Sequence, residues 1–536
     1  MTTEIETAGK TKGQIEHSRL LDVHRWSEHP EVNGFCTDIW NRYFYQKFEP
    51  NGRGNRPKKH PKLQLKVLLL DLYVAWKTDP ELLISLSFTK SAYKGSTRYN
   101  KLHISYILPK LAYHAIEVGL IERNVGNEAS SQVSRIWPTP KLLEYFNGLD
   151  FELYQLEYSS DQEVVCLSKE KDSDDQDLHL VDDESIKKKT PFKYSEYDDF
   201  DAPAEISKWR EVLHDYNRLL SNTFVDIGSL EFPSVKTAYW DKKAKKERTR
   251  TVFIGQHNKY VKRIFYRNDW SLGGRIHGGW WQQVKSDYRK HILINDQPTD
   301  EQDYSGLHVT LLYALQGIQP PSDPYSLNYT TDLTSAVQRS VVKQLVLLAI
   351  NMSPVEGKRY PNGLFTAFRL KQPPKSETKR LNNEALTELL DAFCLEHPLI
   401  EAELCSDKGV TLMNIDGNIT MRVLEHFTNK SIPLLTVHDS YILDIQHQSD
   451  LHKVMTQAIE VEVNLARSIN RPATSYFKFK SKIKPTYAPV ELVSQWFQAD
   501  RWADNLYLNK KINPEVRVNG YLKRCRDWRL VRNIPD

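Results

Sequence analysis

The sequence predicts an α+β protein of several domains. Its 536 residues suffice for about two to four domains of ordinary size. Apolar residues recur at helical spacing over 63–78, 107–120 and 333–353, which is the pattern of amphipathic helices. Short runs rich in β-branched and aromatic residues stand between such segments, most clearly "LLTV" and "SYILDI" within 434–445, and these favour strands.

The composition narrows the class of protein. The chain carries 73 Lys and Arg against 69 Asp and Glu, a net charge of +4. The overall charge therefore does not indicate a nucleic-acid partner. Five cysteines are scattered without a C-x-x-C pair, which disfavours a disulfide framework and a Cys-rich zinc site. No apolar run approaches the roughly 18 residues of a membrane span, and the N-terminus lacks a secretory pattern. We therefore expect a soluble, cytoplasmic protein with no membrane partner.

Residues 1–148 are expected to form a DNA-binding domain. A Gly-, Pro- and Lys-containing linker at 51–62 precedes the first long helical pattern, and the pattern at 107–120 is followed by the polar stretch 125–132 and by "VSRIWP". A helix followed by a β-ribbon resembles a winged helix-turn-helix, in which the helix enters the major groove. A helical domain with an ordinary hairpin fits the pattern equally well. The cations that would face DNA are Lys94, Arg98, Lys101, Lys110, Arg123 and Arg135.

A charged insert is expected over 149–204, because blocks such as "DSDDQD" and "IKKKT" are poorly suited to a core. A helical pattern follows at 204–222, and then the basic run "DKKAKKERTR" at 241–250. The lysines of this run, like those of "YFKFKSKIKP" at 476–485, would track the backbone of a duplex or form solvated strand faces.

Two carboxylates stand at the ends of expected strands. Asp303 follows a β-prone run and precedes the apolar helical segment 307–315, and Asp439 lies between "LLTVH" and "SYILDI", which together predict a β-hairpin. Acids in such positions can project into a cleft. Carboxylates on neighbouring strands can hold two Mg²⁺ ions, with Mn²⁺ as an alternative, for phosphoryl transfer. Taken singly, Asp303 fits a helix cap and Asp439 a turn residue.

Arg339 and Lys343 lie four residues apart within the helical pattern at 333–353. This spacing places both cations on one helix face. A triphosphate requires such a face to neutralise the charge that develops during transfer. On their own, the two residues would equally suit a solvated helix face.

Four motifs, in chain order, are similar to those of the single-subunit polymerases, the superfamily of family A DNA polymerases and phage- and mitochondrial-type RNA polymerases. They are Asp303-Tyr304-Ser305 as motif A, Arg339 and Lys343 as the start of motif B, Asp416-Gly417 as the pair that opens a helix in the RNA polymerase branch, and His438-Asp439-Ser440 as motif C. The resemblance covers roughly residues 270–490.

The resemblance implies an α+β fold with the palm, fingers and thumb of a right-hand polymerase, beside the N-terminal winged-helix-like domain. The expected domains are 1–148 for DNA binding, 149–204 as a charged insert, 205–320 as a thumb-like helix and the first part of the palm, 321–410 as fingers, 411–490 as the second part of the palm, and 491–536 as a C-terminal extension containing "VELVSQWFQADRW".

The resemblance also implies roles for the motif residues. Asp303 and Asp439 would be catalytic metal ligands, and Lys343 would be a further catalytic residue. The residues expected to bind nucleotide are Arg339, Lys343, His308, Asn351 and Tyr304. The residues expected to contact nucleic acid are His438, at the primer end, and Asp416 from the motifs, with Arg275, Arg263, Lys101 and Arg135 from basic segments.

Two departures from the family pattern leave the sugar preference open. Motif B usually carries an aromatic residue and then Tyr-Gly after its Lys, whereas Leu347 and Asn351-Met352 stand at the corresponding positions. His308 stands five residues after Asp303, where DNA polymerases of this superfamily place a bulky side chain against the 2′-hydroxyl. An imidazole there could exclude ribose or hydrogen-bond to it.

The segment 262–291, upstream of motif A, interleaves arginines such as Arg263 and Arg275 with aromatic residues. The aromatic residues are Phe265, Tyr266, Trp270, Trp280 and Trp281. Proteins bind single-stranded nucleic acid with cations that contact phosphates and aromatic rings that stack on bases. Tryptophans, however, are equally suited to a hydrophobic core. We expect Trp281 to lie in the core and Arg275 to serve the function.

Together these features predict a DNA-binding nucleotidyltransferase, a template-directed polymerase that uses nucleoside triphosphates and a DNA template, primer–template or DNA–RNA hybrid. Two alternatives stay open. One is a template-independent terminal nucleotidyltransferase, which the missing motif B aromatic residues would permit. The other is a catalytically inactive replication or regulatory protein that binds DNA on a polymerase-like scaffold, since fold alone does not fix function.

Overall fold

The fold is taken from a computed structural model of the chain. The residues that the structure describes are 14–15, 17–49, 60–93, 98–124, 133–151, 153, 156–158, 162–169, 194–241, 246–373, 376–469 and 516–534. Several predicted segments therefore lie wholly or partly outside the described residues: the linker at 51–62, Lys94, the polar stretch 125–132, most of the charged insert, the run at 476–485 and most of the C-terminal extension.

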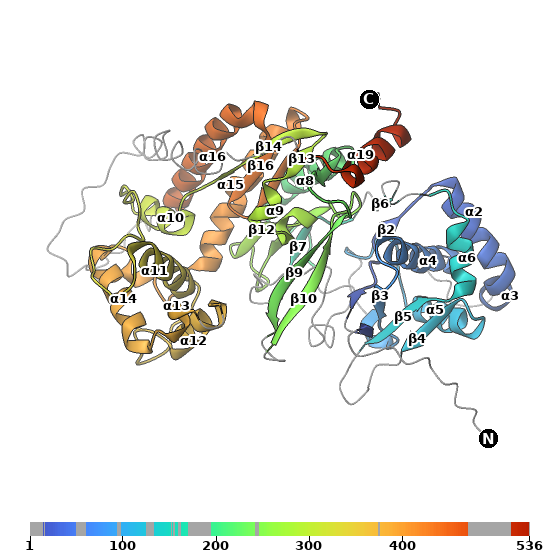
Figure 1. Ribbon diagram of the computed structural model, residues 1–536, viewed down its shortest axis with the longest axis horizontal. Helices are drawn as coiled ribbons and strands as arrows, with labels where there is room; N and C mark the ends of the chain where they lie inside the picture. The colour runs from blue at the N-terminus through green and yellow to red at the C-terminus, as the bar shows by residue number, and fades with distance from the viewer. Residues whose placement is uncertain are drawn as a thin grey trace, which may run out of the picture. The chain divides into compact units, whose positions relative to one another are not determined.

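The chain divides into two compact units, each described here by itself (Figure 1). Unit 1 contains residues 1–268, 277–297 and 513–536, and unit 2 contains 269–276 and 298–512. Both units combine helices with strands, which confirms the predicted mixed α+β class. Among the described residues, no helix is both long and apolar enough to cross a membrane.

The first part of unit 1 is a four-stranded sheet packed with helices. The sheet order is β1-β3-β5-β4, in which only the β1 and β3 pair is parallel. Its strands are β1 (Ser18–Leu20), β3 (Leu83–Leu86), β5 (Ser134–Pro138) and β4 (Ile121–Asn124). The helices are α2 (Pro30–Ile39), α3 (Tyr45–Phe48), α4 (Pro61–Thr78), α5 (Ile107–Glu117) and α6 (Pro140–Asn147). The predicted helices at 63–78 and 107–120 and the β-ribbon after the second one are confirmed.

Helix α4 is the centre of this part, because its side chains from Gln64 to Ala75 are all buried. An apolar run that surrounds the helix axis requires burial on every side. Three polar side chains, Gln64, Lys66 and Asp71, are buried with it. Each has a partner: Gln64 Nε2 donates to Ser105 Oγ at 3.1 Å, Lys66 Nζ to Asn33 Oδ1 at 2.7 Å, and Asp71 accepts from two arginines.

The rest of unit 1 is formed by short strand pairs, helix α8 (Ile206–Ser221) and the last helix, α19 (Asn519–Val531). Helix α8 confirms the helical pattern predicted at 204–222. The strands are β2 (Arg25–Trp26) with β6 (Glu157–Tyr158), β7 (Val165–Leu167) with β11 (Val261–Phe265), β8 (Val225–Ile227) with β13 (Ile292–Ile294), and the antiparallel β9 (Ser234–Asp241) and β10 (Lys246–Phe253). Helix α9 (Ser286–Arg289) lies just before β13. Arg524 of α19 pairs with the buried Asp226 at 2.7 Å.

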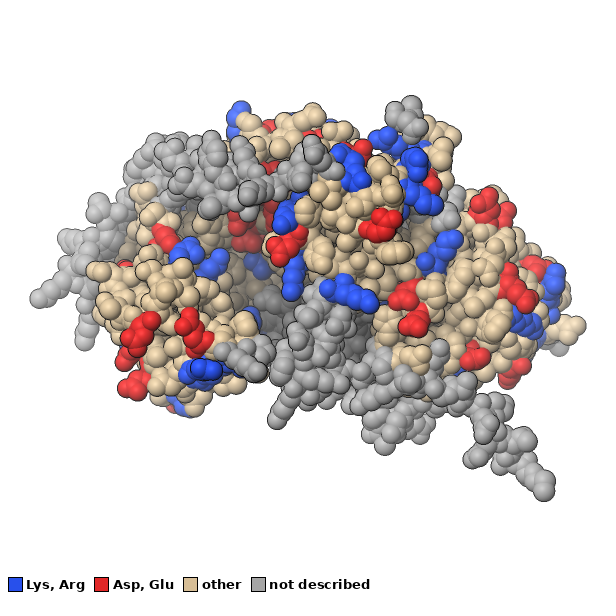
Figure 2. All heavy atoms as spheres, viewed as in Figure 1, with Lys and Arg blue, Asp and Glu red and all other residues tan. Residues whose placement is uncertain are grey.

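Unit 2 is built on a small antiparallel sheet covered by helices. Strand β16 (Ser440–Asp444) pairs with both β14 (Gln297–Asp303) and β15 (Leu434–Val437). The helices are α10 (Leu307–Leu315), α11 (Ser335–Ile350), α12 (Asn362–Lys371), α13 (Glu377–Arg380), α14 (Asn383–Glu396), α15 (Gly409–Asn429) and α16 (Gln448–Ile469). Helices α11 to α14 form one group, over which acidic and basic side chains are interspersed on the face in view (Figure 2).

Helix α15 corrects one sequence expectation. Asp416 and Gly417 do not open this helix, which begins at Gly409. The apolar residues Val410, Leu412 and Met413 continue the helical burial pattern ahead of Asp416, so the helix extends further back. An interior glycine weakens a helix, but a Cβ at Gly417 would lie 2.1 Å from the backbone oxygen of Gly274, and this close approach requires glycine.

The aromatic segment before β14 is mainly core. Phe265, Tyr266, Trp280 and Trp281 are all buried, so they do not offer stacking faces to a single strand. The expectation for Trp281 is confirmed, and the stacking interpretation of the other three is wrong. Apolar side chains of this size gain more from burial than from exposure.

Candidate active site

Strands β14 and β16 bring two carboxylates of unit 2 together. Asp303 lies opposite Ser440 in the antiparallel pair, and Asp439 immediately precedes Ser440. The backbone N–H of Tyr304 donates to the backbone oxygen of Asp439 at 3.3 Å. The predicted strand before Asp303 and the predicted hairpin around Asp439 are confirmed.

His438 and Asp439 form the whole connection of the hairpin, since Val437 pairs directly with Ser440. His438 has a φ of 55°, the left-handed conformation that two-residue hairpin turns use. The tight turn therefore fixes the position of the Asp439 backbone beside the end of β14.

Neighbouring carboxylates raise the affinity of both Asp303 and Asp439 for protons. Asp303 is an exposed residue, but partial desolvation and then the charges of Asp439 and Glu301 raise its pKa, while Lys343 opposes the shift. Burial and then the charge of Asp416 raise the pKa of Asp439, against the influence of Arg275. Like charges at close range disfavour the ionised forms of both groups. Among the described residues, Lys343 and Arg275 therefore offset these effects only in part.

Glu301 is a third carboxylate of this cluster, and the sequence analysis did not identify it. It stands two residues before Asp303 on β14, and alternate residues of a strand face the same side. The hydroxyl of Ser440 donates to Glu301 Oε1 at 2.7 Å. The signal that would have found it is the i, i+2 spacing of acids in "EQD".

Helix α11 presents both predicted cations on one exposed face. Lys343 is close enough to Asp303 to lower the pKa of that carboxyl. Arg339 Nε donates to Asp323 Oδ2 at 2.6 Å. Lys343 therefore lies near the carboxylate pair. The side chain of Arg339 is instead fixed by its hydrogen bond to Asp323, on the loop before the helix.

Tyr325 lies beside these two cations and was also missed. Its ring centroid is 6.0 Å from Arg339 Cζ and 6.0 Å from Lys343 Nζ. Asp439 is near enough to contribute to the raised pKa of this phenol, for which burial is the largest cause. No sequence motif contains Tyr325, so only the tertiary structure identifies it.

A buried ion pair stands next to Asp439. Arg275 Nε donates to Asp416 Oδ2 at 2.5 Å, and Arg275 Nη2 approaches His308 Nε2 at 3.2 Å. The Asp416 side chain is fully buried, which corrects its expected contact with nucleic acid: it holds Arg275 instead. The expectation of a functional position for Arg275 fits its place beside Asp439.

His308 is a neutral, buried imidazole. Burial, and then the charge of Arg275, lower its pKa to about 3. Because a guanidinium only donates hydrogen bonds, Nε2 is the acceptor and Nδ1 carries the proton. Nδ1 is buried and has no partner among the described residues. The side chain thus keeps one unused donor near the site.

Two predicted nucleotide-binding residues have packing roles. The hydroxyl of Tyr304 donates to the backbone oxygen of Met455 at 2.7 Å inside unit 2, and its ring packs on Tyr441. Asn351 ends α11 and its amide donates to the backbone oxygen of Leu347 at 2.7 Å. Asn351 stands about 12 Å along the helix from Lys343 at 1.5 Å per residue. The positions of these side chains argue against the predicted contacts.

The predicted nucleic-acid contacts in unit 1 divide by burial. Arg263 is fully buried, with its guanidinium 4.1 Å from the ring of Trp209, and Arg135 is buried and bonded to Ser18 Oγ at 3.2 Å. Neither presents its charge to a phosphate, which corrects both expectations. Lys101 is exposed, as a phosphate contact requires.

The carboxylate pair fits a divalent cation. Within the described part of the chain, no group of three or more His, Cys, Asp or Glu side chains is arranged as a metal site. Mg²⁺, however, is often bound by only one or two carboxylates together with substrate phosphates and waters. Asp303 and Asp439, whose pKa values stay raised despite Lys343 and Arg275, are the residues that would hold it.

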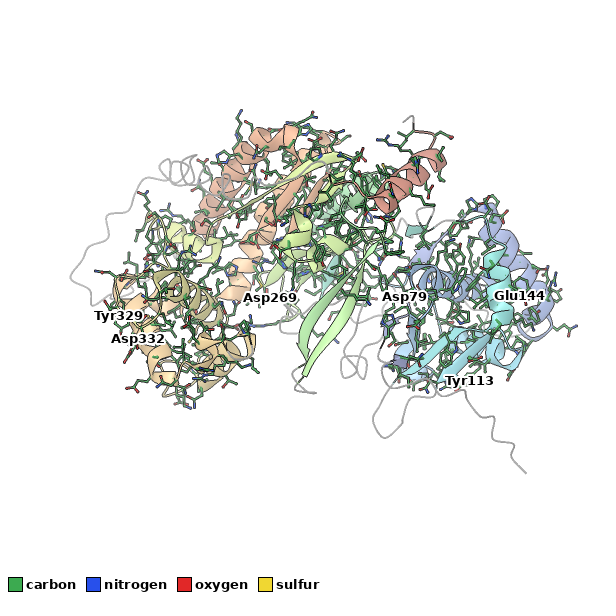
Figure 3. All side chains as sticks on the ribbon, viewed as in Figure 1. Asp79, Tyr113, Glu144, Asp269, Tyr329 and Asp332 are labelled. Atoms are coloured by element: carbon green, nitrogen blue, oxygen red, sulfur yellow. The ribbon has the colours of Figure 1, made fainter. Side chains whose placement is uncertain are left out.

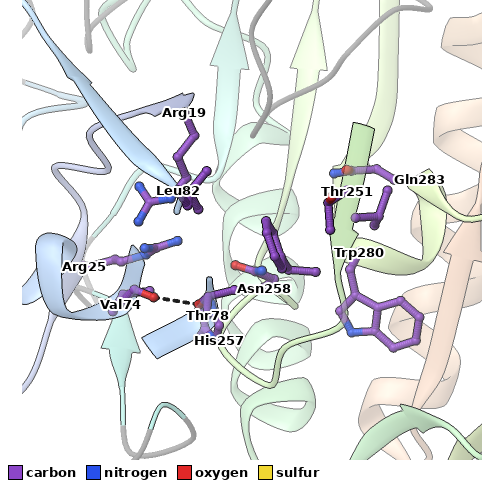
Figure 4. A pocket seen from close by; sticks show the side chains of 12 residues that line it. Arg19, Arg25, Val74, Thr78, Leu82, Thr251, His257, Asn258, Trp280 and Gln283 are labelled. Carbon is purple, nitrogen blue, oxygen red and sulfur yellow. Dashed lines mark hydrogen bonds between the residues drawn. The ribbon is translucent and has the colours of Figure 1, made fainter. Parts of the chain in front are cut away.

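A cavity in unit 1 is a different kind of site (Figure 4). It measures about 30 Å³ and is lined by Arg19, Arg25 and Trp280, among other residues. This volume suits one or two water molecules, whereas ligand pockets measure several hundred Å³. The indole N–H of Trp280 and Oδ1 of Asn258, both buried and without partners among the described residues, suit a hydration site. The cavity is too small for a nucleotide.

Comparison with known proteins adds no relative: no family model, no curated protein and no solved structure matches this chain.

Proposed function

We propose that the protein is a DNA-binding nucleotidyltransferase, and specifically a template-directed nucleic acid polymerase. The observation that carries this proposal is the pairing of β14 with β16, which sets Asp303 beside Asp439 with Lys343 close by. Two adjacent carboxylates with a cation opposite are what the transfer of a nucleotidyl group to a hydroxyl requires. Under this proposal β14 to β16 are the palm, α11 to α14 the fingers and α8 a thumb-like helix.

The side chains of the site would have separate roles in metal binding and triphosphate binding. Asp303 and Asp439 would hold Mg²⁺, which on binding neutralises phosphate charge and activates the attacking hydroxyl. Lys343 and Arg339 would bind the triphosphate and stabilise its charge during transfer. Arg275 is held in place by the buried Asp416, and would keep its positive charge beside Asp439.

The first part of unit 1 would bind DNA under this proposal. Its helix α5 and the β4/β5 ribbon have the order of a winged helix. Lys101 and Lys110 are exposed there, and so is Tyr113 (labelled in Figure 3). The guanidinium of Arg123 lies 4.0 Å from the ring of Phe88 and 5.0 Å from that of Tyr113. Cations and aromatic faces of this kind suit phosphate and base contacts.

The experiment is a primer–template extension assay with Mg²⁺, in which labelled dNTPs and NTPs are offered separately. Wild type is compared with Asp439→Ala and with the control Asp444→Asn, which removes an acid at the far end of β16, the strand that Asp439 precedes. We expect template-matched incorporation by wild type and by the control, and loss in Asp439→Ala.

Other outcomes of this assay separate the alternatives. Incorporation without any template requirement, lost in Asp439→Ala, would favour a terminal transferase. Absence of incorporation from both nucleotide pools, together with salt-sensitive DNA binding, would refute catalysis and leave a DNA-binding scaffold.

A further inference from the structure

We propose that Tyr325 is a substrate-contacting residue, whose phenolic hydroxyl hydrogen-bonds to an oxygen of the incoming nucleoside triphosphate. This inference rests on the proposed function and deepens it, because it assigns a residue outside all four motifs to the nucleotide site.

The first support is position. Tyr325 lies in the segment between α10 and α11, and its ring stands at equal distance, 6.0 Å, from the charged groups of Arg339 and Lys343. The ring also lies close to Gly306 at the start of α10, where a Cβ would be 3.4 Å from it. Tyr325 is therefore near both the cations of α11 and the chain segment that follows Asp303.

The second support is an unsatisfied hydroxyl. Tyr325 is 2 % exposed, and its Oη has no hydrogen-bond partner among the residues that the structure describes. Leaving such a group buried and unpaired costs free energy, and buried polar groups are normally satisfied. A bound molecule that supplies the partner removes this cost.

Other buried tyrosines of unit 2 show that the fold normally provides such partners. The hydroxyl of Tyr304 donates to the Met455 backbone oxygen at 2.7 Å, that of Tyr313 lies 2.7 Å from His397 Nδ1, and that of Tyr441 lies 3.1 Å from Thr420 Oγ1. Tyr325 departs from this pattern, and it does so beside the carboxylate pair. The contrast indicates that its hydroxyl is kept for a ligand.

The third support is the chemistry of the neighbours. Lys343, and Arg339 with its partner Asp323, stand beside the ring. These cations would attract an anionic, oxygen-rich group, and a triphosphate or the sugar that carries it offers hydrogen-bond acceptors. Helix α11 contains no aromatic residue of its own over Ser335–Ile350. Tyr325 is the aromatic side chain that the loop supplies against the face of Arg339 and Lys343.

The test compares Tyr325→Phe with Tyr313→Phe in the full-length protein. Phenylalanine keeps the ring and removes only the hydroxyl. For Tyr325→Phe we expect an unchanged or higher Tm, since no intramolecular bond is lost, and about a tenfold weaker nucleotide interaction. For Tyr313→Phe we expect the reverse, a lower Tm with an unchanged KM for nucleotide.

Two readouts keep this inference separable from the proposed function. One is KM in primer extension, and the other is direct binding of an NTP and a dNTP in the presence of Mg²⁺. An equal loss for both nucleotides locates the bond at the triphosphate, and a larger loss for the NTP locates it at the sugar. Unchanged KM and binding in Tyr325→Phe would overturn this inference alone. If wild type neither incorporates nor binds nucleotide, both proposals fail.

Discussion

Two clusters of charged side chains, one in each unit, differ in how their charges are balanced. In unit 1, Asp71 accepts two hydrogen bonds from Arg19, each of 2.8 Å, and one of 2.6 Å from Arg25, while Asp22 lies 3.3 Å from Arg25. Two cations therefore balance two anions. In unit 2, Asp303, Glu301 and Asp439 stand together. Lys343 lowers the pKa of Asp303, and Arg275, which is also paired with Asp416, lowers that of Asp439.

The difference separates a structural cluster from a candidate site. A buried charge is tolerated when a partner compensates it, and the Asp71 cluster meets this condition within the protein. Asp303 and Asp439 are only partly compensated by the described residues, and acids with raised pKa values are typical of functional sites. The charge that would compensate them is expected to arrive with substrate and metal.

The largest expected effect is on catalysis. Asp303→Asn should reduce template-dependent incorporation by about a thousandfold or more, which corresponds to roughly 4 kcal/mol of transition-state stabilisation. Its Tm should be equal to or higher than that of wild type, because one repelling charge is removed. Primer extension and thermal unfolding of the same preparation measure both, and a variant that keeps full activity would remove Asp303 from the site.

The opposite result is expected in the compensated cluster. Asp71→Ala leaves two buried guanidinium groups without their shared partner, and should lower the free energy of unfolding by about 3–5 kcal/mol. The control is Asp79→Ala, which removes a partly exposed acid paired with His17 at 2.8 Å (Figure 3) and should cost less than about 1 kcal/mol. Urea unfolding measures the loss of stability in each variant. Equal losses in Asp71→Ala and Asp79→Ala would contradict a special structural role for the Asp71 cluster.

Mg²⁺ should stabilise one unit through its carboxylates. At a free concentration about ten times its Kd, Mg²⁺ should add about 1.4 kcal/mol to the stability of wild type. Asp303→Asn should lose most of this increment. Asp71→Ala, which changes unit 1, should still show the Mg²⁺ increment for unit 2. Thermal shift with Mg²⁺ and Ca²⁺ measures the effect without any need for activity.

The smallest effect is a pH dependence without metal. Because the folded protein raises the pKa of Asp303 and Asp439, it binds their protons more tightly than the unfolded chain does. The free energy of unfolding should therefore fall as pH rises from about 4, the unfolded value, through the folded pKa values. Asp303→Asn should flatten this slope, and an unchanged slope would show that the pair does not repel.

Periodicity predicted much of the fold. Helices α4, α5, α8 and α11 and the hairpin of β15 and β16 follow from apolar spacing and β-branched runs, because these patterns depend on neighbours in sequence. Trp280, for which the sequence left stacking and core both open, is core, and Asp416, which the resemblance placed at the start of a helix, is interior to α15. Burial depends on contacts between distant segments, and no local pattern contains them.

The sequence by itself determined the candidate acids and cations, Asp303, Asp439 and Lys343, and the elements that carry them. Only the tertiary structure decided which side chains accompany them. Glu301 and Tyr325 lie at the site, whereas the side chains of Arg263 and Tyr304 are buried in the interior of their units. The physical reason is that chemistry resides in residue types and local spacing, whereas electrostatic compensation and hydrogen-bond satisfaction depend on what strand pairing and packing bring within a few ångströms.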